Sequence, residues 1–391
     1  MNKGQFKKGQ TGNPKGRPKV QRVKSTILNS HLEPTEGFKK TFGSNNAWIP
    51  FGNDNLFPQG VASITRRSPI HRGIVNYKKI YITGKGFISD SDSTNSFFLQ
   101  ANNRGETLKQ VFQKLVFDEL SSGNAYLKIV KGQGFINLFH QDYTQARLSK
   151  NGESVFLHPN WANVKQEKKK LVEIPLYPNF KRIDGFEQSI VHFKSYEPTF
   201  THYGIPDWFA GMESAQIAWK TNRWNVSRLN NDFSTSGVLV VDGQFSEKDA
   251  EDLQKNFEDQ FTGDGKQGQV MLLIKQMGGE GTQFTPVSQT KEGEWLDLQR
   301  QSGDDLIVAH NWFRSLTSMQ DSTGFDTKRI LNEYEVAHNT VIPEKRQEFI
   351  PIIAKILQTE LGLDIDNMDI VNTSSLSLAS RLDANLVTKI W

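Results

Sequence analysis

The stretch from Tyr203 to Gly243 constrains the fold most, because it reads as a long helix followed directly by a strand. Pro206 suits a first helical turn, where its missing N–H costs nothing, and Asp207 places a negative charge at the positive end of the helix dipole. A continuous helix over 206–233 would be roughly 40 Å long at about 1.5 Å per residue, enough to span a domain or join two. One apolar stripe runs along it at helical spacing: Trp208, Met212, Ala215, Trp219, Val226, Leu229 and Phe233.

A small module with a strand at each end follows this helix. The β-branched run 238–241 predicts the first strand, and Ser246 with the acidic residues after it predicts a helix start. Apolar residues then repeat every four positions over 253–261, before several glycines end the helix. The run 270–274 predicts a buried strand, so the module is a β-α-β unit at the far end of the long helix.

The residues before the long helix form a mixed block of about 150 residues. Ser68-Pro69 predicts a helix that ends before Gly84, and residues 108–120 predict an amphipathic helix capped at Gly123. We interpret the basic residues near the first of these helices as an exposed, solubilising face rather than a DNA contact: Arg66, Arg67, Lys78 and Lys79. Strands are expected, between turn signals, at 126–130, 135–139, 146–148, 154–157, 171–176 and 189–193.

Two further helical patterns follow the small module. Apolar residues from Trp295 to Phe313 form a stripe that stops near Arg314, and a polar stretch separates it from a third pattern that reaches Leu361. Pro343 and Pro351 are expected to kink or split this last helix, because each removes a backbone donor. One strand at 368–372 and a short helix complete the chain.

This order of elements resembles the portal proteins of tailed bacteriophages over most of residues 46–361. The motifs that carry the resemblance are a Tyr203-Gly204-Ile205-Pro206 helix start, a Ser236-Gly237-Val238-Leu239 strand, and Ser121, Gly123, Asn124, Ala125, Tyr126 and Leu127 upstream. The resemblance implies an α+β, portal-like fold. It has an α/β wing, long stem helices, a small β-α-β clip and a kinked helix after a tunnel loop.

The resemblance also divides the chain into segments with expected roles. These are a disordered basic N-terminal arm (1–45), a wing (46–202), a stem helix (203–235), a clip (236–290), a second stem helix (291–314), a tunnel loop (315–327), a kinked wing helix (328–362), and a short C-terminal segment or reduced crown (363–391).

The function that the resemblance implies is that of a portal, a homo-oligomeric ring at one capsid vertex. Double-stranded DNA would be packed and ejected through it, and a dodecamer is expected. The implied partners are the terminase large subunit, which would supply the motor energy, the major capsid protein and a head-tail adaptor. The implied location is the virion, after assembly in the bacterial host cytoplasm. Two alternatives stay open: a nuclease-like DNA-processing enzyme with a basic arm, and a structural head protein that forms no ring.

Candidate site residues follow from the tunnel loop and the stem. The loop 315–327 holds no Lys or Arg, which suits a channel, because strong phosphate contacts in every subunit would trap a sliding polyanion. The plainer alternatives are an ordinary surface loop, and salt bridges from its flanking cations to helix acids such as Glu333. The channel candidates are Arg314, Ser318, Gln320, Ser322, Thr323, Lys328 and Arg329. The residues expected to pack along the stem are Trp208, Met212, Trp219 and Phe233.

Positive charge is concentrated at the N-terminus. The first 24 residues hold eight Lys or Arg and no acid, whereas the whole chain has net charge +4, so the remainder carries −4. The segment Gly16-Arg17-Pro18-Lys19 is similar to the core of AT-hook peptides, which lie in the DNA minor groove. The alternative is a solvated arm without specific contacts. The candidate DNA contacts are Lys15, Arg17, Lys19 and Arg22.

Signals for enzyme chemistry are missing from the sequence. The chain has no cysteine, which rules out disulfides and thiolate metal sites. The glycine-rich segment 263–268 lacks the Gly-Lys-Ser/Thr ending of a phosphate loop, and the eight histidines lack metal-ligand spacing. Asp364, Asp366 and Asp369 lack the glycine and glutamate of a calcium loop. We therefore expect a protein that is no enzyme and uses no cofactor or metal. With no apolar run long enough for a membrane span, no membrane partner is expected.

Deleting residues 1–24 should weaken binding to free DNA and flatten its salt dependence, because the charges that neutralise phosphates are concentrated there. Affinity for duplex DNA, titrated at several salt concentrations on the full chain and the deletion variant, measures both effects. Unchanged affinity in the deletion variant would contradict the prediction.

Overall fold

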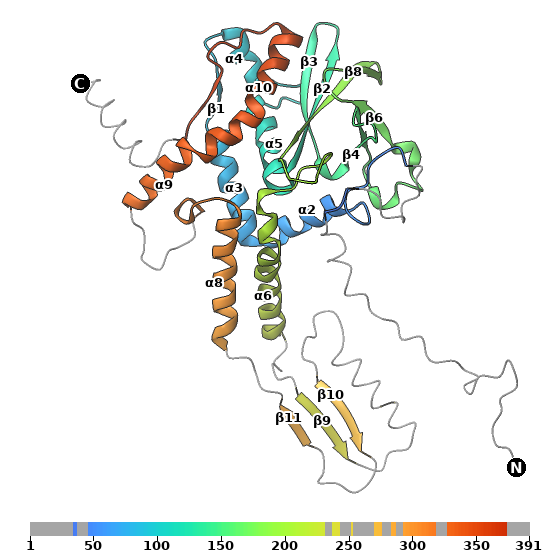
Figure 1. Cartoon of the computed structure of the whole chain (residues 1–391), viewed down its shortest axis with the longest axis vertical. Coiled ribbons are helices and arrows are strands. Elements are labelled where there is room, and N and C mark those ends of the chain that lie inside the picture. Colours follow the sequence, from blue (N-terminus) through green and yellow to red (C-terminus); the bar gives the residue numbers. More distant parts are fainter. Residues whose placement is uncertain are drawn as a thin grey trace, which may run out of the picture.

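The computed structural model describes residues 34–36, 46–230, 237–242, 252, 270–275, 283–286, 292–317 and 327–373. A mixed body of helices and sheets occupies one end, and two helices leave it side by side toward a small separate sheet (Figure 1). This is the α+β, portal-like architecture expected from the sequence. We call this body the wing and the two helices the stem.

A four-stranded antiparallel sheet in the order β3-β2-β8-β7 forms the centre of the wing. Its strands are β2 (Asn124–Gly132), β3 (Phe135–Gln141), β7 (Lys181–Ile183) and β8 (Phe186–Lys194). Helix α5 (Leu108–Ser122) packs on β2 and β3, and a capping box between Thr107 and Gln110 starts it. Buried side chains of the helix and sheet, such as Phe112, Leu127 and Ile190, join in the main core.

Two smaller sheets complete the wing. One has the order β4-β5-β6, from β4 (Ala146–Leu148), β5 (Ser154–Leu157) and β6 (Val172–Pro175). Short 3-10 turns accompany it at η1 (Tyr143–Gln145), η2 (Trp161–Asn163) and η3 (Lys168–Lys170). The other pairs β1 (Gly86–Ile88) with β12 (Asp369–Val371), so the late strand expected at 368–372 returns to the start of the wing.

Helices pack around the sheets of the wing (Figure 1). They are α2 (Phe57–Arg67), α3 (Pro69–Thr83), α4 (Asp92–Leu99), α9 (Thr327–Asn339) and α10 (Val341–Leu361). Helix α3 begins and ends as the Ser68-Pro69 and Gly84 signals predict, whereas α2 and α4 were not expected. The helix expected over 328–362 is divided at Thr340, before both prolines. Pro343 lies in the first turn of α10, where no intrahelical donor is needed, and α10 continues through Pro351.

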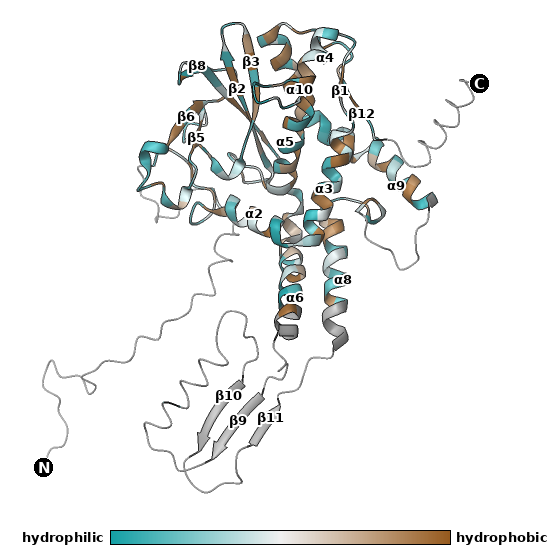
Figure 2. Ribbon diagram, turned by 180° about the vertical axis from the view of Figure 1, so that it is seen from behind, coloured by the Kyte–Doolittle hydropathy of each residue, from teal (hydrophilic) through white to brown (hydrophobic). Residues whose placement is uncertain are grey.

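The stem differs from one continuous helix over 206–233. Its first turn is a 3-10 helix, η4 (Asp207–Gly211), and α6 (Met212–Asn230) continues it, while residues 231–236 lie outside the described part of the chain. The bond from the N–H of Phe209 to the carbonyl of Pro206, at 2.9 Å, closes this tighter turn. Figure 2 shows both stem helices banded between hydrophilic and hydrophobic residues, as expected of amphipathic helices.

The second stem helix, α8 (Glu292–Ala309), runs antiparallel to α6. The pairings Ser214 Oγ to Asp305 Oδ2 at 3.4 Å and Gln299 Nε2 to Asn222 Oδ1 at 3.1 Å show this direction. Small residues allow close approach where the helices leave the wing, because a Cβ added to Gly211 would lie 2.9 Å from the Cβ of Ala309. The helix ends at Ala309, earlier than the expected residue 314, and a left-handed Asn311 with φ of 47° follows it.

The small sheet beyond the stem has the order β10-β9-β11. Strands β9 (Gly237–Asp242) and β10 (Val270–Lys275) are parallel, as the expected β-α-β order requires. Strand β11 (Gln283–Pro286), which the sequence did not predict, joins the other edge of β9 in antiparallel direction.

Lys78 corrects the interpretation of the basic residues in the early helices. Its side chain is 1% exposed, and its Nζ donates to the carbonyl oxygen of His310 at 2.8 Å. It therefore belongs to the packing between α3 and the end of α8, whereas Arg66 and Arg67 are exposed.

Trp208→Ala should cost about 3–5 kcal/mol of the free energy of unfolding, because this side chain is fully buried. Trp219 is the matched control, since it is only half-buried, with the guanidinium of Arg67 4.9 Å from its ring, and Trp219→Ala should cost clearly less. Equilibrium denaturant unfolding of the two variants measures the difference, and equal losses would contradict the burial described here.

Candidate functional site

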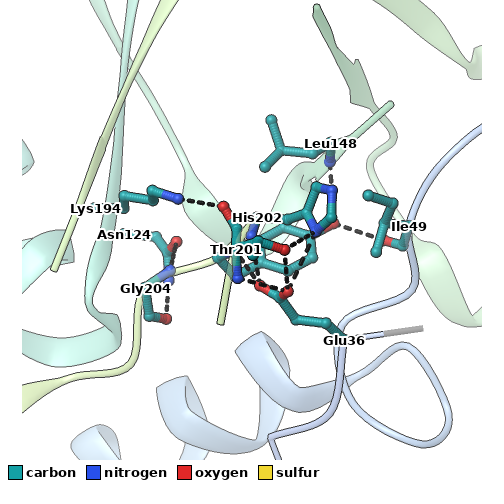
Figure 3. Close-up of polar contacts among 9 residues, drawn as sticks. Glu36, Ile49, Asn124, Leu148, Lys194, Thr201, His202 and Gly204 are labelled. Carbon is teal, nitrogen blue, oxygen red and sulfur yellow. Dashed lines mark hydrogen bonds and ion pairs between the residues drawn. The ribbon is translucent and has the colours of Figure 1, made fainter. Parts of the chain in front are cut away.

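The wing and the stem meet where two backbone turns pack against each other. Asn124, which follows α5, donates from Nδ2 to the carbonyl of Gly204 and accepts the Gly204 N–H at Oδ1, both at 2.8 Å (Figure 3). The N–H of Ser195, at the end of β8, donates to the carbonyl of Gly123 at 2.9 Å. Two of the motifs behind the portal resemblance, 121–127 and 203–206, are therefore in direct contact.

Two glycines make this contact possible. A Cβ added to Gly204 would lie 2.0 Å from the carbonyl oxygen of Gly123, far inside van der Waals contact. Gly123 caps α5 with φ of 71°, and a Cβ there would lie 2.4 Å from the carbonyl carbon of Ile205. Any side chain at either position would force the two turns apart.

Tyr203 connects the same turn to the beginning of the wing. Its hydroxyl donates to the carbonyl of Ile49 at 2.6 Å and accepts from the N–H of Leu148 at 3.0 Å. Its ring stacks on Phe51, with centroids 4.2 Å apart and planes 3° from parallel. Tyr203 thereby holds the start of the stem against Ile49 and Phe51 and against β4.

Glu36 binds the backbone of the turn from the other side (Figure 3). Its carboxylate accepts the N–H groups of Tyr203 at 2.5 Å, His202 at 2.8 Å and Thr201 at 2.9 Å. Burial alone would raise the pKa of Glu36, but these backbone hydrogen bonds outweigh it and lower the pKa. Residues 34–36 of the expected arm therefore contact the wing, and the rest of 1–45 lies outside the described residues.

Trp208 extends this contact between stem and wing to the helices of the wing. Its Nε1 donates to the carbonyl of Ser121 at 3.0 Å, and its ring lies 3.9 Å from that of His71. Thr65 Oγ1 donates to the Val61 carbonyl, so it accepts from His71 Nε2 at 3.0 Å. His71 Nδ1 then accepts from His310 Nε2 at 2.9 Å.

Burial keeps both histidines of this chain of hydrogen bonds neutral. It lowers the pKa of His71 to about 3, with a smaller effect from the charge of Arg72. It also lowers the pKa of His310 well below its usual value. The end of α8 is therefore tied to α3 by uncharged hydrogen bonds that persist over the ordinary pH range.

The expected stem residues lie in different environments. Trp208 and Met212 are buried, at 0% and 6% exposure, and Trp219 is half-buried. Phe233 lies outside the described residues. The packing role of these four side chains between neighbouring copies stays a prediction.

The expected channel residues are described only at the two ends of the loop. The 3-10 turn η5 (Arg314–Thr317) occupies its first residues, and Thr327 already begins α9. Arg314 pairs with Asp304, and Arg329 Nε contacts Glu333 Oε1 at 2.7 Å, as the salt-bridge alternative expected. Lys328 is exposed. The other channel candidates, Ser318, Gln320, Ser322 and Thr323, and the arm residues Lys15, Arg17, Lys19 and Arg22 lie outside the described residues.

Sequence reasoning did not identify Glu36, His71 or His310 as parts of this contact between wing and stem. The Tyr203-Gly204 and Gly123-Asn124 motifs did mark its centre, but nothing in their spacing showed that they touch. Within the described ranges, no group of acids and histidines is arranged to hold a metal ion. The helices in those same ranges include none with the length and apolar character to cross a membrane.

Gly204→Ala should destabilise the protein by about 3 kcal/mol or more, because the new methyl group overlaps the Gly123 carbonyl. Gly73→Ala is the matched control. No heavy atom lies within 4 Å of a Cβ at that helical position, so alanine there should be neutral or stabilising by up to about 1 kcal/mol. Thermal or denaturant unfolding compares the two variants. A Gly204→Ala protein as stable as Gly73→Ala would show that the turns do not pack this closely.

Comparison with known proteins matches residues 77–302 to the phage portal protein family and residues 2–44 to a family of unknown function (DUF5681). An uncharacterized protein of Rickettsia bellii (strain RML369-C) is 28% identical over 133 residues, which are 33% of this chain and 34% of that protein. A second, of Rickettsia felis (strain ATCC VR-1525 / URRWXCal2), is 25% identical over 123 residues, 31% of each. The chain therefore matches about a third of the length of these curated relatives.

Solved structures share the fold at low sequence identity. A chain from the neck of a native gene transfer agent (GTA) particle, computed with C12 symmetry, has a TM-score of 0.53 at 18% identity, over 85% of this chain and 89% of that chain. A chain from the virion of a native GTA particle has a TM-score of 0.52 at 16% identity, over 84% and 88%. Because the family match covers residues 77–302 of 391, more than half of the chain, this protein belongs to the phage portal protein family.

Proposed function

We propose that copies of this protein assemble into a ring within a phage-like virion and that double-stranded DNA passes through its centre. The observation that carries the proposal is the antiparallel pair of α6 and α8, which leaves the wing and leads to the small β9–β11 sheet (Figure 1). Family membership and the likeness to a chain from a neck computed with C12 symmetry support the same assignment. Twelve copies are the expected number.

The stem pair suits lateral association between copies. Ala215 and Ala218 of α6 and Leu306 of α8 are each 0% exposed, but a two-helix pair leaves its outer faces uncovered. Val226 and Val308 are 56% and 79% exposed on those faces. Long helices gain most of their stability from packed apolar faces, so contacts with neighbouring stems would stabilise this pair.

The segment between α8 and α9 is proposed as the loop that lines the narrowest part of the channel. The cations that flank it, Arg314 and Arg329, are engaged by Asp304 and Glu333. Their pairing reduces the attraction that each copy offers to a passing phosphate, which favours sliding over trapping. In this proposal Lys328 and the polar residues Ser318, Gln320, Ser322 and Thr323 make only intermittent DNA contacts.

The remaining assignments follow from the proposed ring. Residues 46–202 and 328–362 form its wing, 236–290 its clip, and the N-terminal arm an additional DNA contact. The chain has no enzymatic role in this proposal. A separate terminase ATPase supplies the packaging energy, and the ring docks that enzyme, the major capsid protein and a head-tail adaptor.

Negative-stain images of the purified protein should show rings with a central hole, and native mass spectrometry should give one closed number of copies, expected to be twelve. The Gly73→Ala protein serves as a control that keeps the fold and should form the same rings. Monomers or small open oligomers at every concentration would contradict the proposal and favour a DNA-processing enzyme or a head protein that forms no ring.

A further inference from the structure

A buried lysine joins three carboxylates at the start of the stem. Lys345 Nζ, on α10, lies 2.8 Å from Glu119 Oε1, 3.2 Å from Glu348 Oε1 and 3.3 Å from Asp207 Oδ2. The Lys345 side chain is 10% exposed and that of Glu119 is 2% exposed, so this pair interacts with little screening, whereas Asp207 and Glu348 are 41% and 36% exposed. We call these four residues the Lys345 cluster.

The three carboxylates come from parts of the chain that must keep a fixed relation to one another. Glu119 lies in α5, immediately before the Gly123 turn, and also accepts from Ser195 Oγ at 2.6 Å. Asp207 is the first residue of η4, where the stem begins. Glu348 lies on α10, one turn after Lys345. The cluster therefore connects the stem start with two wing helices, beside the packed turns.

Negative charge is in excess within the cluster. Burial alone would lower the pKa of Lys345, but Glu119, Asp207 and Glu348 together raise it, so this lysine stays charged. Lys78, on α3, is a further cation that interacts with these four residues, and burial lowers its pKa to about 8. Burial and the charges of Glu119 and Asp207 raise the pKa of Glu348 to about 7, although Lys345 opposes them.

We propose that the Lys345 cluster is a proton-responsive joint between the wing and the start of the stem. When Glu348 carries a proton, Lys345 is shared between Glu119 and Asp207 and holds the stem start against α5. When Glu348 is ionised, it competes for Lys345 and repels Asp207, and the contact between stem and wing weakens. This device goes beyond the proposed channel function, and it operates in each folded copy whether or not a ring forms.

The pH window follows from the direction of the shift. The folded-state pKa of Glu348, about 7, is above its ordinary value of 4.5. Protons therefore bind the folded protein more tightly than the unfolded chain. The stabilisation of the folded protein by protonated Glu348 is fully present below pH 4.5 and is lost as the pH rises through about 7.

Glu348→Gln tests the proposal, because the amide keeps the shape of the protonated acid and cannot ionise. At pH 5, just above the ordinary pKa of 4.5, the variant should be only slightly more stable than the wild type. At pH 8 its equilibrium constant for unfolding should be about tenfold lower than that of the wild type. Tenfold corresponds to one pKa unit, which allows for the partial exposure of Glu348.

Glu344→Gln is the matched control, since it removes the same charge from an exposed position in the first turn of the same helix. Its stability relative to the wild type should not change between pH 5 and pH 8. If Glu348→Gln follows the wild type at both pH values, or if Glu344→Gln behaves like Glu348→Gln, the proposal is wrong.

A double-mutant cycle with Asp207→Asn determines whether the proton acts on the stem start. At pH 8, where Glu348 and Asp207 repel each other, the two substitutions together should stabilise by less than the sum of their separate effects. At pH 5 the effects should be additive. Additivity at both pH values would show that Glu348 titrates without influencing the start of the stem, and would overturn the proposal.

Discussion

The contact between the carbonyl of Gly123 and the backbone of Gly204 is the constraint on which the rest of the structure depends. There is no room for a Cβ between the two turns, and the side chain of Asn124 satisfies both the N–H and the carbonyl of Gly204. Buried backbone groups must be paired, so this one amide side chain replaces the ladder partners that a strand would supply. The direction in which the chain leaves the wing is set at this point.

Other interactions act on the stem through this contact. Glu36 and Tyr203 hold the outer side of the turn, and Trp208 reaches back from the first stem residues to the carbonyl of Ser121. The returning helix is fixed separately, where His310 bonds to His71 and accepts from Lys78. The first stem helix is thus attached to α5 and the second to α3.

Local signals were sufficient to predict much of this architecture from the sequence. Ser68-Pro69, Gly84 and Gly123 bound their helices as expected, since capping depends on nearby residues alone. The strands expected at 126–130, 135–139, 146–148, 154–157, 171–176, 189–193 and 270–274 also lie close to observed strands, because a strand's composition is set by the face it buries. The family resemblance then supplied the order of wing, stem and clip.

Features that depend on distant partners could not be predicted. Lys78 can be buried because its ammonium group donates a hydrogen bond to the carbonyl of His310, 232 positions later. A helical pattern carries no sign of such a partner. The Lys345 cluster joins α5, η4 and α10 in the same way. Short elements such as α4 and β11 escaped notice because tertiary contacts rather than periodicity define them. The division at Thr340 shows that a proline in a first helical turn need not be where a helix breaks.

Amide hydrogen exchange at Gly204 and Ser195, measured at one pH near 6, tests the central claim most directly. Both N–H groups donate within the packed turns. If this contact sets the direction of the stem, the two amides should exchange as slowly as those paired between β2 and β8, and only through global unfolding. Rapid exchange at these two amides while the β2–β8 amides stay protected would show that the contact between the two turns opens locally. That result would contradict the account.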